Sequence, residues 1–224
     1  MEIVGHGGAG HFYPGNSRKA VQKGLDLGVD RIEIDVQIAG DGNLVLLHDD
    51  VIRFEGKRRP VRQLTLGQLR EQFDDLLTLD EVIRLVENRA SLQIDLKSPG
   101  YEREIAAAIS RSGIATTAIV SSTYALSLRR VRAHVPGVRT GLSTGHISSV
   151  TRLTPAVRVI SAIFTVIAPI PLLSIAKLTG ASFLMLNYRI ASRPLLRLAE
   201  RIGIGSYVWT VDNPKSIRKM SRLD

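Results

Sequence analysis

Short apolar runs alternate with amphipathic segments along most of the chain. Runs with the length and β-branched content of strands lie at 2–6, 31–36, 44–48, 92–97, 118–122, 138–143, 182–187 and 206–211. Apolar positions with helical spacing lie between them, at 16–28, 64–73, 79–87, 101–111 and 193–202. A further helix is expected after the strand at 118–122, where it runs through Arg132, and a short one at the end of the chain. Strands that alternate with helices are typical of a parallel fold. The pattern therefore predicts an α/β fold of the TIM-type (β/α)8 barrel.

One connection between predicted strands is too short for a parallel crossover. Parallel neighbours need a dozen or more connecting residues, and far fewer separate Val36 from Leu44. Asp41-Gly42 is a two-residue hairpin signal. We therefore expect 44–48 to fold back antiparallel, with paired residue numbers that sum to about 81. That register places His48 opposite Glu33.

Carboxylates interrupt two of the predicted buried strands. Glu33 and Asp35 are two residues apart, so their side chains project from one face of a strand. Asp95 and Lys97 repeat this spacing in the run 92–97. Carboxylates that share an apolar face repel each other and lose hydration unless a cation lies between them. The three acids predict a site for one divalent cation, Mg²⁺ or Ca²⁺. For each acid taken alone, a salt-bridged or exposed edge position remains the alternative.

Histidines end two of the predicted strands. His6 follows the first strand and His48 ends the run 44–48. Active sites of β/α barrels lie at the carboxyl ends of their strands. Two imidazoles that titrate near neutrality can serve as acid and base in displacement at phosphorus. A strand-end histidine that only satisfies hydrogen bonds is the alternative for each one.

Composition narrows the classes of function. The chain has 224 residues, which suits one domain over 1–224, and it has no cysteine, which excludes disulfides and thiolate chemistry. The net charge of +9 favours anionic partners. Aromatic residues are 5% and do not alternate with the basic ones, so a nucleic-acid partner is not expected. No signal peptide precedes the first strand, which predicts a cytoplasmic protein, either free or membrane-associated.

A long uncharged segment lies within the region from about 150 to 180. Residues 159–176 carry no charge, and Arg158 and Lys177 flank them. Pro169 and Pro171 should break the segment into two pieces. A membrane span would separate strands of one sheet, so we do not expect one. Two interpretations remain: a helix buried against the barrel, or peripheral membrane contact with basic flanks on anionic head groups.

Several motifs together resemble the glycerophosphodiester phosphodiesterase family. They are GHGGAG with PGNS, IEIDVQ with DGNLVLLHDD, LQIDLKSP, SSTY and YVWTVDNP, and they cover most of the chain. The resemblance implies a barrel that binds one divalent metal and hydrolyses glycerophosphodiesters or lysophospholipids to an alcohol and a phosphomonoester. The substrate is then a small-molecule or lipid phosphodiester.

The resemblance also implies roles for single residues. Glu33 and Asp35 match the metal-binding pair, and Asp95 lies where the family usually has a glutamate ligand. Lys97 matches a lysine near the phosphate, so it is counted with the catalytic residues. The catalytic acid and base of the family match His6 and His48. Substrate-binding positions match Asn16 and Trp209.

Three positions depart from the family pattern. Gly7 stands where an arginine is usual, Gly15 where a glutamate is usual, and Asp95 is one methylene shorter than glutamate. A glycine cannot grip a phosphate as arginine does. The departures leave open an alternative function, a catalytically impaired family member that binds membranes or lipids. Family members also continue with a further strand after SIRKM, so either the barrel lacks its closing strand or 44–48 serves as a barrel strand.

Overall fold

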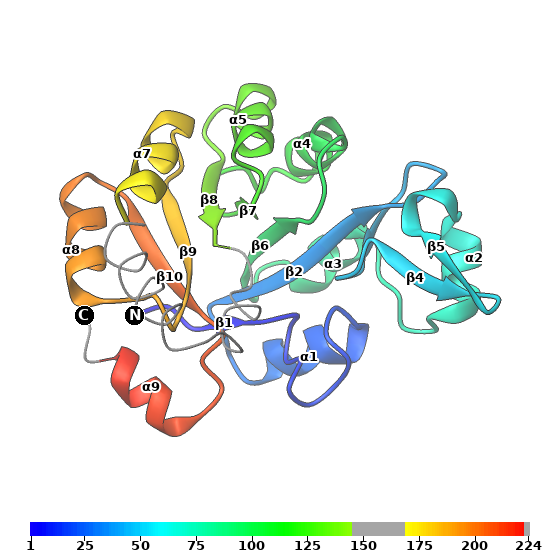
Figure 1. Ribbon diagram of the computed structural model, residues 1–224. Helices are drawn as coiled ribbons and strands as arrows, with labels where there is room; N and C mark the ends of the chain where they lie inside the picture. The colour runs from blue at the N-terminus through cyan, green and yellow to red at the C-terminus, as the bar shows by residue number, and fades with distance from the viewer. Residues whose placement is uncertain (145–168, 222–224) are drawn as a thin grey trace, which may run out of the picture. The chain divides into compact units, whose positions relative to one another are not determined.

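The computed structural model describes residues 1–144 and 169–221 (Figure 1). The chain divides into two compact units. The first comprises Met1–Ser122 with Arg130–Arg139, and the second comprises Thr123–Arg129 with the chain from Thr140 onward. Strands and helices alternate in both units, as the apolar pattern predicts. The expectation of a single domain over 1–224 stays a prediction.

Parallel strands form the centre of the first unit. They are β1 (Val4–Gly5), β2 (Arg31–Ile38), β6 (Ser91–Leu96) and β7 (Ile119–Ser122), and they pair in the order β1-β2-β6-β7. Helices of this unit include α1 (Arg18–Asp26), α3 (Leu79–Val86) and α4 (Glu102–Arg111). Alternate β2 residues Ile32, Ile34 and Val36 are fully buried on one face of the strand, so the acids between them project from the other face.

The helices of the first unit begin where the sequence provides caps. The side chain of Ser17 accepts a hydrogen bond from the backbone N–H of Ala20 at the start of α1. Thr78 and Glu81 form a reciprocal capping box at the start of α3. Each cap satisfies backbone donors that the first turn leaves unpaired, so these helix starts are fixed by local sequence.

The run after Asp41 folds back as expected, but with a different register. β3 (Leu44–Leu46) pairs antiparallel with the end of β2, and Val36 lies opposite Leu46. The loop has three residues rather than two, because Ala39 and Asn43 close it by a backbone hydrogen bond and Gly42 takes a φ of +84°. The predicted pairing of His48 with Glu33 is therefore wrong by one residue, and the ladder ends at Leu46. The same pairing answers the question of 44–48: it is a hairpin return.

A second hairpin follows β3 that the apolar pattern did not predict. β4 (Val51–Phe54) pairs antiparallel with β5 (Lys57–Pro60), and a 3-10 turn, η1 (Val61–Gln63), and α2 (Leu66–Gln72) come next. A small hydrophobic cluster anchors this region and comprises Ala39, Val45, Phe54, Val61, Leu64, Leu69 and Leu76. Lysine and arginine fill most of β5, so its sequence lacks the apolar alternation of a half-buried strand.

The second unit has its own parallel strands. β8 (Arg139–Ser143), β9 (Phe183–Asn187) and β10 (Gly205–Trp209) pair in that order, and α5 (Ala125–His134) contributes residues to both units. The helices α7 (Pro169–Thr179), α8 (Arg193–Arg201) and α9 (Pro214–Met220) complete this part of the chain.

The uncharged segment contains the start of a helix at its first proline. α7 begins at Pro169 and includes Pro171, so within the described residues Pro171 does not interrupt the helix, and whether the prolines divide the whole segment stays a prediction. Proline is tolerated in the first turn of a helix because backbone N–H groups there have no acceptor within the helix. Residues 159–168 of the uncharged segment lie outside the described residues. Within the described ranges, no helix is both long and apolar enough to cross a bilayer.

Candidate active site

Three carboxylates meet on neighbouring parallel strands. The register of β2 and β6 places Asp35 directly beside Asp95, and Glu33 lies two residues earlier on the same face of β2. One oxygen atom from each of the three lies within 4.8 Å of the others. Glu33 and Asp35 are buried and Asp95 is partly buried. The structure therefore brings together the acids that the sequence predicted as metal ligands, and we call these three residues the acid cluster.

Lys97 supplies a positive charge to the acid cluster. Its Nζ lies 2.7 Å from Asp35 Oδ1 and 2.9 Å from Asp95 Oδ2. Burial acts to lower the pKa of Lys97, but the carboxylates of Asp95 and Asp35 more than offset it and raise that pKa above its usual range. Lys97 is therefore a fixed cation between two of the three carboxylates.

The pKa values of Glu33 and Asp35 are shifted in opposite directions. Burial, followed by the charges of Asp35 and Asp95, raises the pKa of Glu33 well above its usual value of 4.5. Burial also acts to raise the pKa of Asp35, but Lys97 and a hydrogen bond from Asn16 more than offset it, so that pKa is lowered. Of these two carboxyl groups, Glu33 is therefore the one whose environment disfavours ionisation.

A divalent cation fits this set of residues. The donors are all carboxylate oxygens, which Mg²⁺ and Ca²⁺ prefer. Three ionised carboxylates and one ammonium leave a formal charge of −2, which a divalent cation would neutralise. Burial is the main cause of the raised pKa of Glu33, and the nearby charges of Asp35 and Asp95, which such a cation would offset, add to it. Glu33, Asp35 and Asp95 are the residues that would hold the ion.

The side chain of Asn16 forms hydrogen bonds with Asp35. Its Nδ2 donates to Asp35 Oδ2 at 2.8 Å, and its Oδ1 accepts from the backbone N–H of Asp35 at 2.9 Å. Asn16 is buried and has a φ of +67°, a left-handed conformation that asparagine tolerates better than most residues. Both ends of its amide are thus committed to Asp35, and the substrate-binding role expected for Asn16 stays a prediction.

Two further residues of the site were not found from the sequence. Ser121 in β7 lies beside Asp95 in register and donates from Oγ to Asp95 Oδ1 at 2.7 Å. Tyr101 is buried, and its hydroxyl donates to Val36 O at 2.7 Å and accepts from the backbone N–H groups of Lys97 and Ser98 at 3.1 Å each. Ser121 orients Asp95, and Tyr101 fixes the turn that carries Lys97. The SSTY motif contains Ser121 without giving it a role, but nothing local in the sequence points to Tyr101.

Both candidate catalytic histidines lie at the surface of the first unit. The Nε2 atom of His6 is 3.8 Å from Glu33 Oε2, and its side chain is half exposed. His48 is also half exposed, with Nδ1 at 2.8 Å from Asp49 Oδ1. Its charge contributes to lowering the pKa of Asp35, so it acts on the acid cluster. A hydrogen bond to Asp49 orients the His48 ring, His6 lies near Glu33, and both rings are accessible from solvent, as a general acid or base must be.

Gly7 and Gly15, the two glycines that depart from the family pattern, have closely packed backbones. Gly7 has a φ of +56°, and its backbone N–H donates to Glu33 Oε2 at 2.9 Å. A Cβ added to Gly7 would lie 3.1 Å from the Cα atom of Gly15. A side chain at position 7 would be strained by the backbone conformation and crowded by Gly15. The two departures from the family pattern are thus coupled through one close backbone contact.

Trp209 lies in the second unit. It ends β10, and its carbonyl accepts a hydrogen bond from the backbone N–H of Tyr188 at 2.8 Å. The role expected for Trp209 in lining a substrate pocket stays a prediction.

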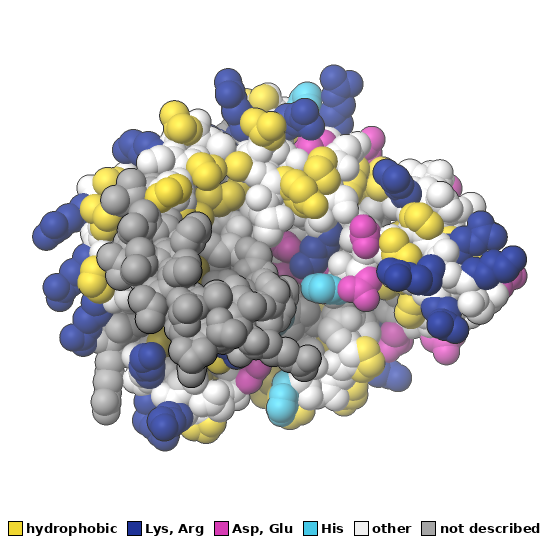
Figure 2. Space-filling view, viewed as in Figure 1, with side chains coloured by type: hydrophobic (Ala, Val, Ile, Leu, Met, Phe, Trp, Pro, Cys, Tyr) yellow, Lys and Arg dark blue, Asp and Glu magenta, His cyan; other side chains and the backbone are white. Residues whose placement is uncertain are grey.

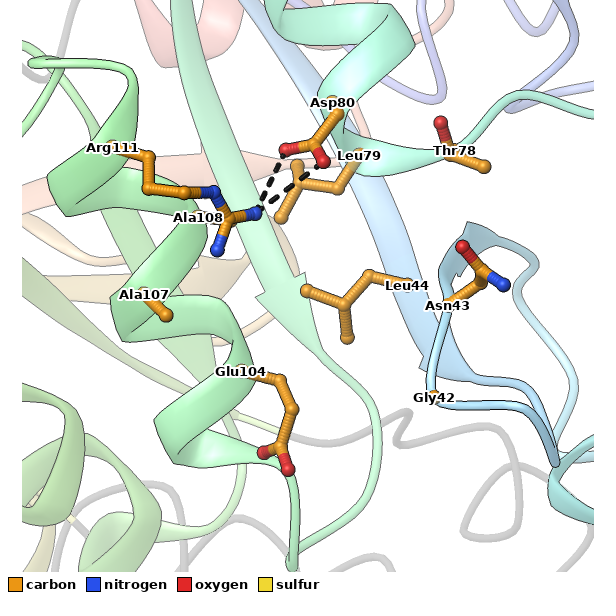
Figure 3. Close-up of a pocket in the computed structure, with 10 residues that line it drawn as sticks. All are labelled: Gly42, Asn43, Leu44, Thr78, Leu79, Asp80, Glu104, Ala107, Ala108 and Arg111. Carbon is orange, nitrogen blue, oxygen red and sulfur yellow. Dashed lines mark hydrogen bonds and ion pairs between the residues drawn. The ribbon is translucent and has the colours of Figure 1, made fainter.

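A separate pocket of the first unit contains none of these residues. It has a volume of about 280 Å³ and lies between the loop before β3, the start of α3 and the helix α4 (Figure 3). Arg111 reaches Asp80 across it at 3.4 Å. Because no member of the acid cluster lines this pocket, we treat it as distinct from the candidate active site.

Comparison of the sequence with known protein families identifies the family of this chain. Residues 6–224 match the model of the glycerophosphoryl diester phosphodiesterase family. The chain belongs to this family. Its members are phosphoric diester hydrolases, the class that the sequence motifs implied.

Individual relatives agree with the family match. A glycerophosphodiester phosphodiesterase of Caldanaerobacter subterraneus is 31% identical over 158 residues, which are 62% of this chain and 65% of that protein. The chain thus covers slightly less than two thirds of this relative.

Solved structures of family members share the fold. A glycerophosphodiester phosphodiesterase of Thermotoga maritima matches with a TM-score of 0.75 at 23% identity, over 100% of this chain and 92% of that one. A phosphodiesterase of Oleispira antarctica, solved in complex with the product sn-glycerol-3-phosphate, matches with a TM-score of 0.77 at 18% identity, over 100% and 90%. The predicted α/β fold of the TIM barrel type is confirmed by these likenesses.

Proposed function

We propose that this family member catalyses the divalent-cation-dependent hydrolysis of glycerophosphodiesters to an alcohol and a phosphomonoester. The observation that carries the proposal is the acid cluster of Glu33, Asp35 and Asp95, whose oxygens lie within 4.8 Å of one another beside Lys97. Family membership supports the reaction class. The Oleispira antarctica neighbour supports the product class, because it was solved with a glycerol phosphomonoester.

The metal would contribute charge and Lewis acidity. A divalent cation held by the acid cluster would polarise a phosphoryl oxygen of the substrate. Either Mg²⁺ or Ca²⁺ suits a set of carboxylate oxygens. Lys97 helps to lower the pKa of Asp35 and adds a fixed cation close to the charge that develops on phosphorus.

His6 and His48 would move the protons. One imidazole takes a proton from the attacking hydroxyl, which belongs either to water or to the substrate itself. The other donates a proton to the oxygen of the leaving alcohol. Their half-exposed rings allow contact with a substrate that arrives from solvent. Glu33 lies 3.8 Å from His6 and Asp49 lies 2.8 Å from His48, so each ring has a carboxylate beside it.

Two substrate classes remain within the proposal. The alcohol released is either a small head group from a glycerophosphodiester or the head group of a lysophospholipid. Peripheral membrane contact through 159–176, as the sequence suggested, would favour the lipid. The part of this segment that the structure describes lies in α7. Trp209 would line the substrate pocket in either case.

A catalytically impaired lipid-binding protein is not the favoured alternative. Glu33, Asp35, Lys97 and both histidines match the family motif, and Asp95 supplies a carboxylate at the remaining ligand position. Gly7 and Gly15 remove two side chains around these groups but leave the acid cluster intact.

Release of the alcohol tests the proposal. Purified protein is incubated with glycerophosphocholine or lysophosphatidylcholine, with Mg²⁺ or Ca²⁺, and choline is measured. We expect turnover that EDTA abolishes and His48→Ala reduces at least about a hundredfold. His134→Ala at the end of α5 is the matched control and should leave turnover unchanged. Turnover that persists undiminished in both EDTA and the His48 variant would refute the mechanism.

A further inference from the structure

An apolar groove lies between two helices of the second unit. It has a volume of about 570 Å³, and its lining is formed by Leu173, Ser174, Lys177, Leu178, Leu198 and Ile202. α7 supplies the first four and α8 with the residue that follows it supplies the last two. Lys177 Nζ donates to Ile202 O at 3.3 Å, so a hydrogen bond joins the two helices. We call this feature the α7–α8 groove.

Two large apolar side chains that line the groove, Leu178 and Leu198, are exposed, and so is Ile175, which lies on α7 outside the groove lining. Leu178 is 82% exposed, Ile175 is 43% exposed and Leu198 is 41% exposed. Further burial of these three side chains would need contact with a surface other than the described residues of this unit. The transfer of a leucine side chain from water to an apolar phase is favourable, in proportion to the apolar area that it buries. Several such side chains on adjacent helices form an apolar strip that is costly to leave in water.

Basic side chains surround the apolar strip. Arg193, Arg197 and Arg201 recur every four residues, so they follow one side of α8. They are exposed, as is Lys177 on α7. Residues 169–221 carry eight lysines and arginines and only two acids, Glu200 and Asp212. Figure 2 shows basic side chains gathered over α8 and α9, at the left of the view. The surroundings of the groove are therefore strongly cationic.

The exposed apolar side chains and the basic side chains together fit one kind of partner, an anionic lipid bilayer. Exposed apolar side chains between cations suit the interface of an anionic bilayer, where leucines enter the acyl boundary and arginines contact the phosphates of the head groups. Each lysine or arginine near such a surface contributes roughly 1 kcal/mol, about a fivefold gain in binding. Neither contribution alone gives stable attachment, but the apolar and cationic contributions add.

We propose that the α7–α8 groove is a docking surface for anionic lipid bilayers. The second unit binds the membrane through Leu178, Ile175 and Leu198, and Arg197, Arg201 and Lys177 contact the lipid phosphates. This surface assigns membrane contact to described residues of two helices, and it does not depend on the proposed hydrolysis. Its function would be to hold the protein at the surface where phospholipid-derived diesters arise.

Vesicle flotation with the full chain tests the proposal without any turnover. The vesicles contain phosphatidylcholine alone or equal parts of phosphatidylcholine and phosphatidylglycerol, and EDTA is present throughout. We expect binding to the anionic vesicles that weakens steeply with added salt and is at least about tenfold weaker for neutral vesicles. Leu178→Glu and the double variant Arg197→Glu/Arg201→Glu should each lower binding at least about tenfold.

Matched variants separate docking from general effects. Leu27→Glu changes a leucine that is 54% exposed in the first unit, so it should bind like the wild type. Arg197→Lys keeps the charge and should also bind like the wild type. The proposal is overturned by equal binding to both kinds of vesicle, by unchanged binding of the Leu178 variant, or by the absence of vesicle binding. It is also overturned if Leu178→Glu instead abolishes self-association in size-exclusion chromatography, which would make the groove an interface between copies.

Discussion

Asn16 and Asp35 contact each other at both ends of the asparagine amide. Nδ2 donates to the Asp35 carboxylate at 2.8 Å, and Oδ1 accepts from the Asp35 backbone N–H at 2.9 Å. The pair joins the loop before α1 to the middle of β2, across 19 residues of sequence. This contact fixes the orientation of a proposed metal ligand, so changing Asn16 should affect the site before it affects the fold.

Substitutions at Asn16 separate this hydrogen bonding from backbone strain. Asn16→Gly removes both hydrogen bonds but tolerates the φ of +67°, and it should destabilise the protein by about 2 kcal/mol. Asn16→Ala adds the cost of a left-handed alanine, about 1 kcal/mol more. Both should weaken Mg²⁺ binding, because Asp35 loses its orientation. Urea denaturation and metal titration measure the two effects. Wild-type stability and metal affinity in the glycine variant would contradict this role.

Lys97→Met should destabilise the metal-free protein and strengthen its response to metal. Removal of the ammonium leaves Asp35 and Asp95 without the cation that lies 2.7 and 2.9 Å away, at a cost of about 2 kcal/mol. A divalent cation would then relieve more repulsion than in the wild type. We therefore expect a larger rise in Tm on adding Mg²⁺, together with loss of turnover. Thermal unfolding with and without Mg²⁺ checks this result.

The control for Lys97 is a lysine in an exposed ion pair. Lys19 lies 3.8 Å from Asp75, and its side chain is 71% exposed. Lys19→Met should change neither stability nor the metal response measurably. A metal response of the Lys97 variant that is equal to or smaller than that of the wild type would contradict the prediction.

Metal affinity should depend on pH through Glu33. Burial and the charges of Asp35 and Asp95 raise the pKa of Glu33, so in the metal-free protein it keeps a proton at pH values where ordinary glutamate is ionised. A cation must displace this proton in order to bind. Affinity for Mg²⁺ should therefore rise with pH up to the raised pKa and become constant above it.

Calorimetric titration in buffers of different ionisation enthalpy measures the proton released. Glu33→Gln cannot ionise, so it should bind metal weakly and without this pH dependence. If wild-type affinity is constant as the pH rises from 4.5, the usual value for glutamate, Glu33 is not a ligand that must lose a proton.

Arg58→Glu should stabilise the hairpin of β4 and β5. Arg53 lies directly opposite Arg58 in the antiparallel ladder, and like charges in that position repel. A glutamate there would form an opposite-charge pair and raise the free energy of unfolding by about 0.5 kcal/mol. Arg59→Glu is the matched control, since Arg59 lies opposite Ile52 and gains no such partner. An equal change in stability for both variants would show that only net charge matters.

Local sequence predicted much of the site, because strand periodicity determines which face a side chain occupies. Glu33 and Asp35 had to share a face of β2, and the spacing of Asp95 and Lys97 repeated this on β6. The parallel register that sets Asp35 beside Asp95 is a tertiary result, because a shift of one residue would turn Asp95 to the other face of the sheet.

Other parts of the site depend on contacts that sequence spacing does not encode. Tyr101 reaches Val36 from a position 65 residues away, and Ser121 meets Asp95 only through the pairing of β6 and β7. The hairpin register was wrong by one residue because Gly42 adopts a left-handed conformation and lengthens the loop. One glycine conformation thus decided a register that the apolar pattern alone left ambiguous.

The acid cluster is tested most directly by crystals of the protein soaked in Mn²⁺, an ion that substitutes for Mg²⁺ and gives an anomalous signal. The account predicts an anomalous peak bound by the oxygens of Glu33, Asp35 and Asp95, and no peak in crystals of Asp35→Asn. Strong Mn²⁺ density elsewhere with none among these three carboxylates would contradict it.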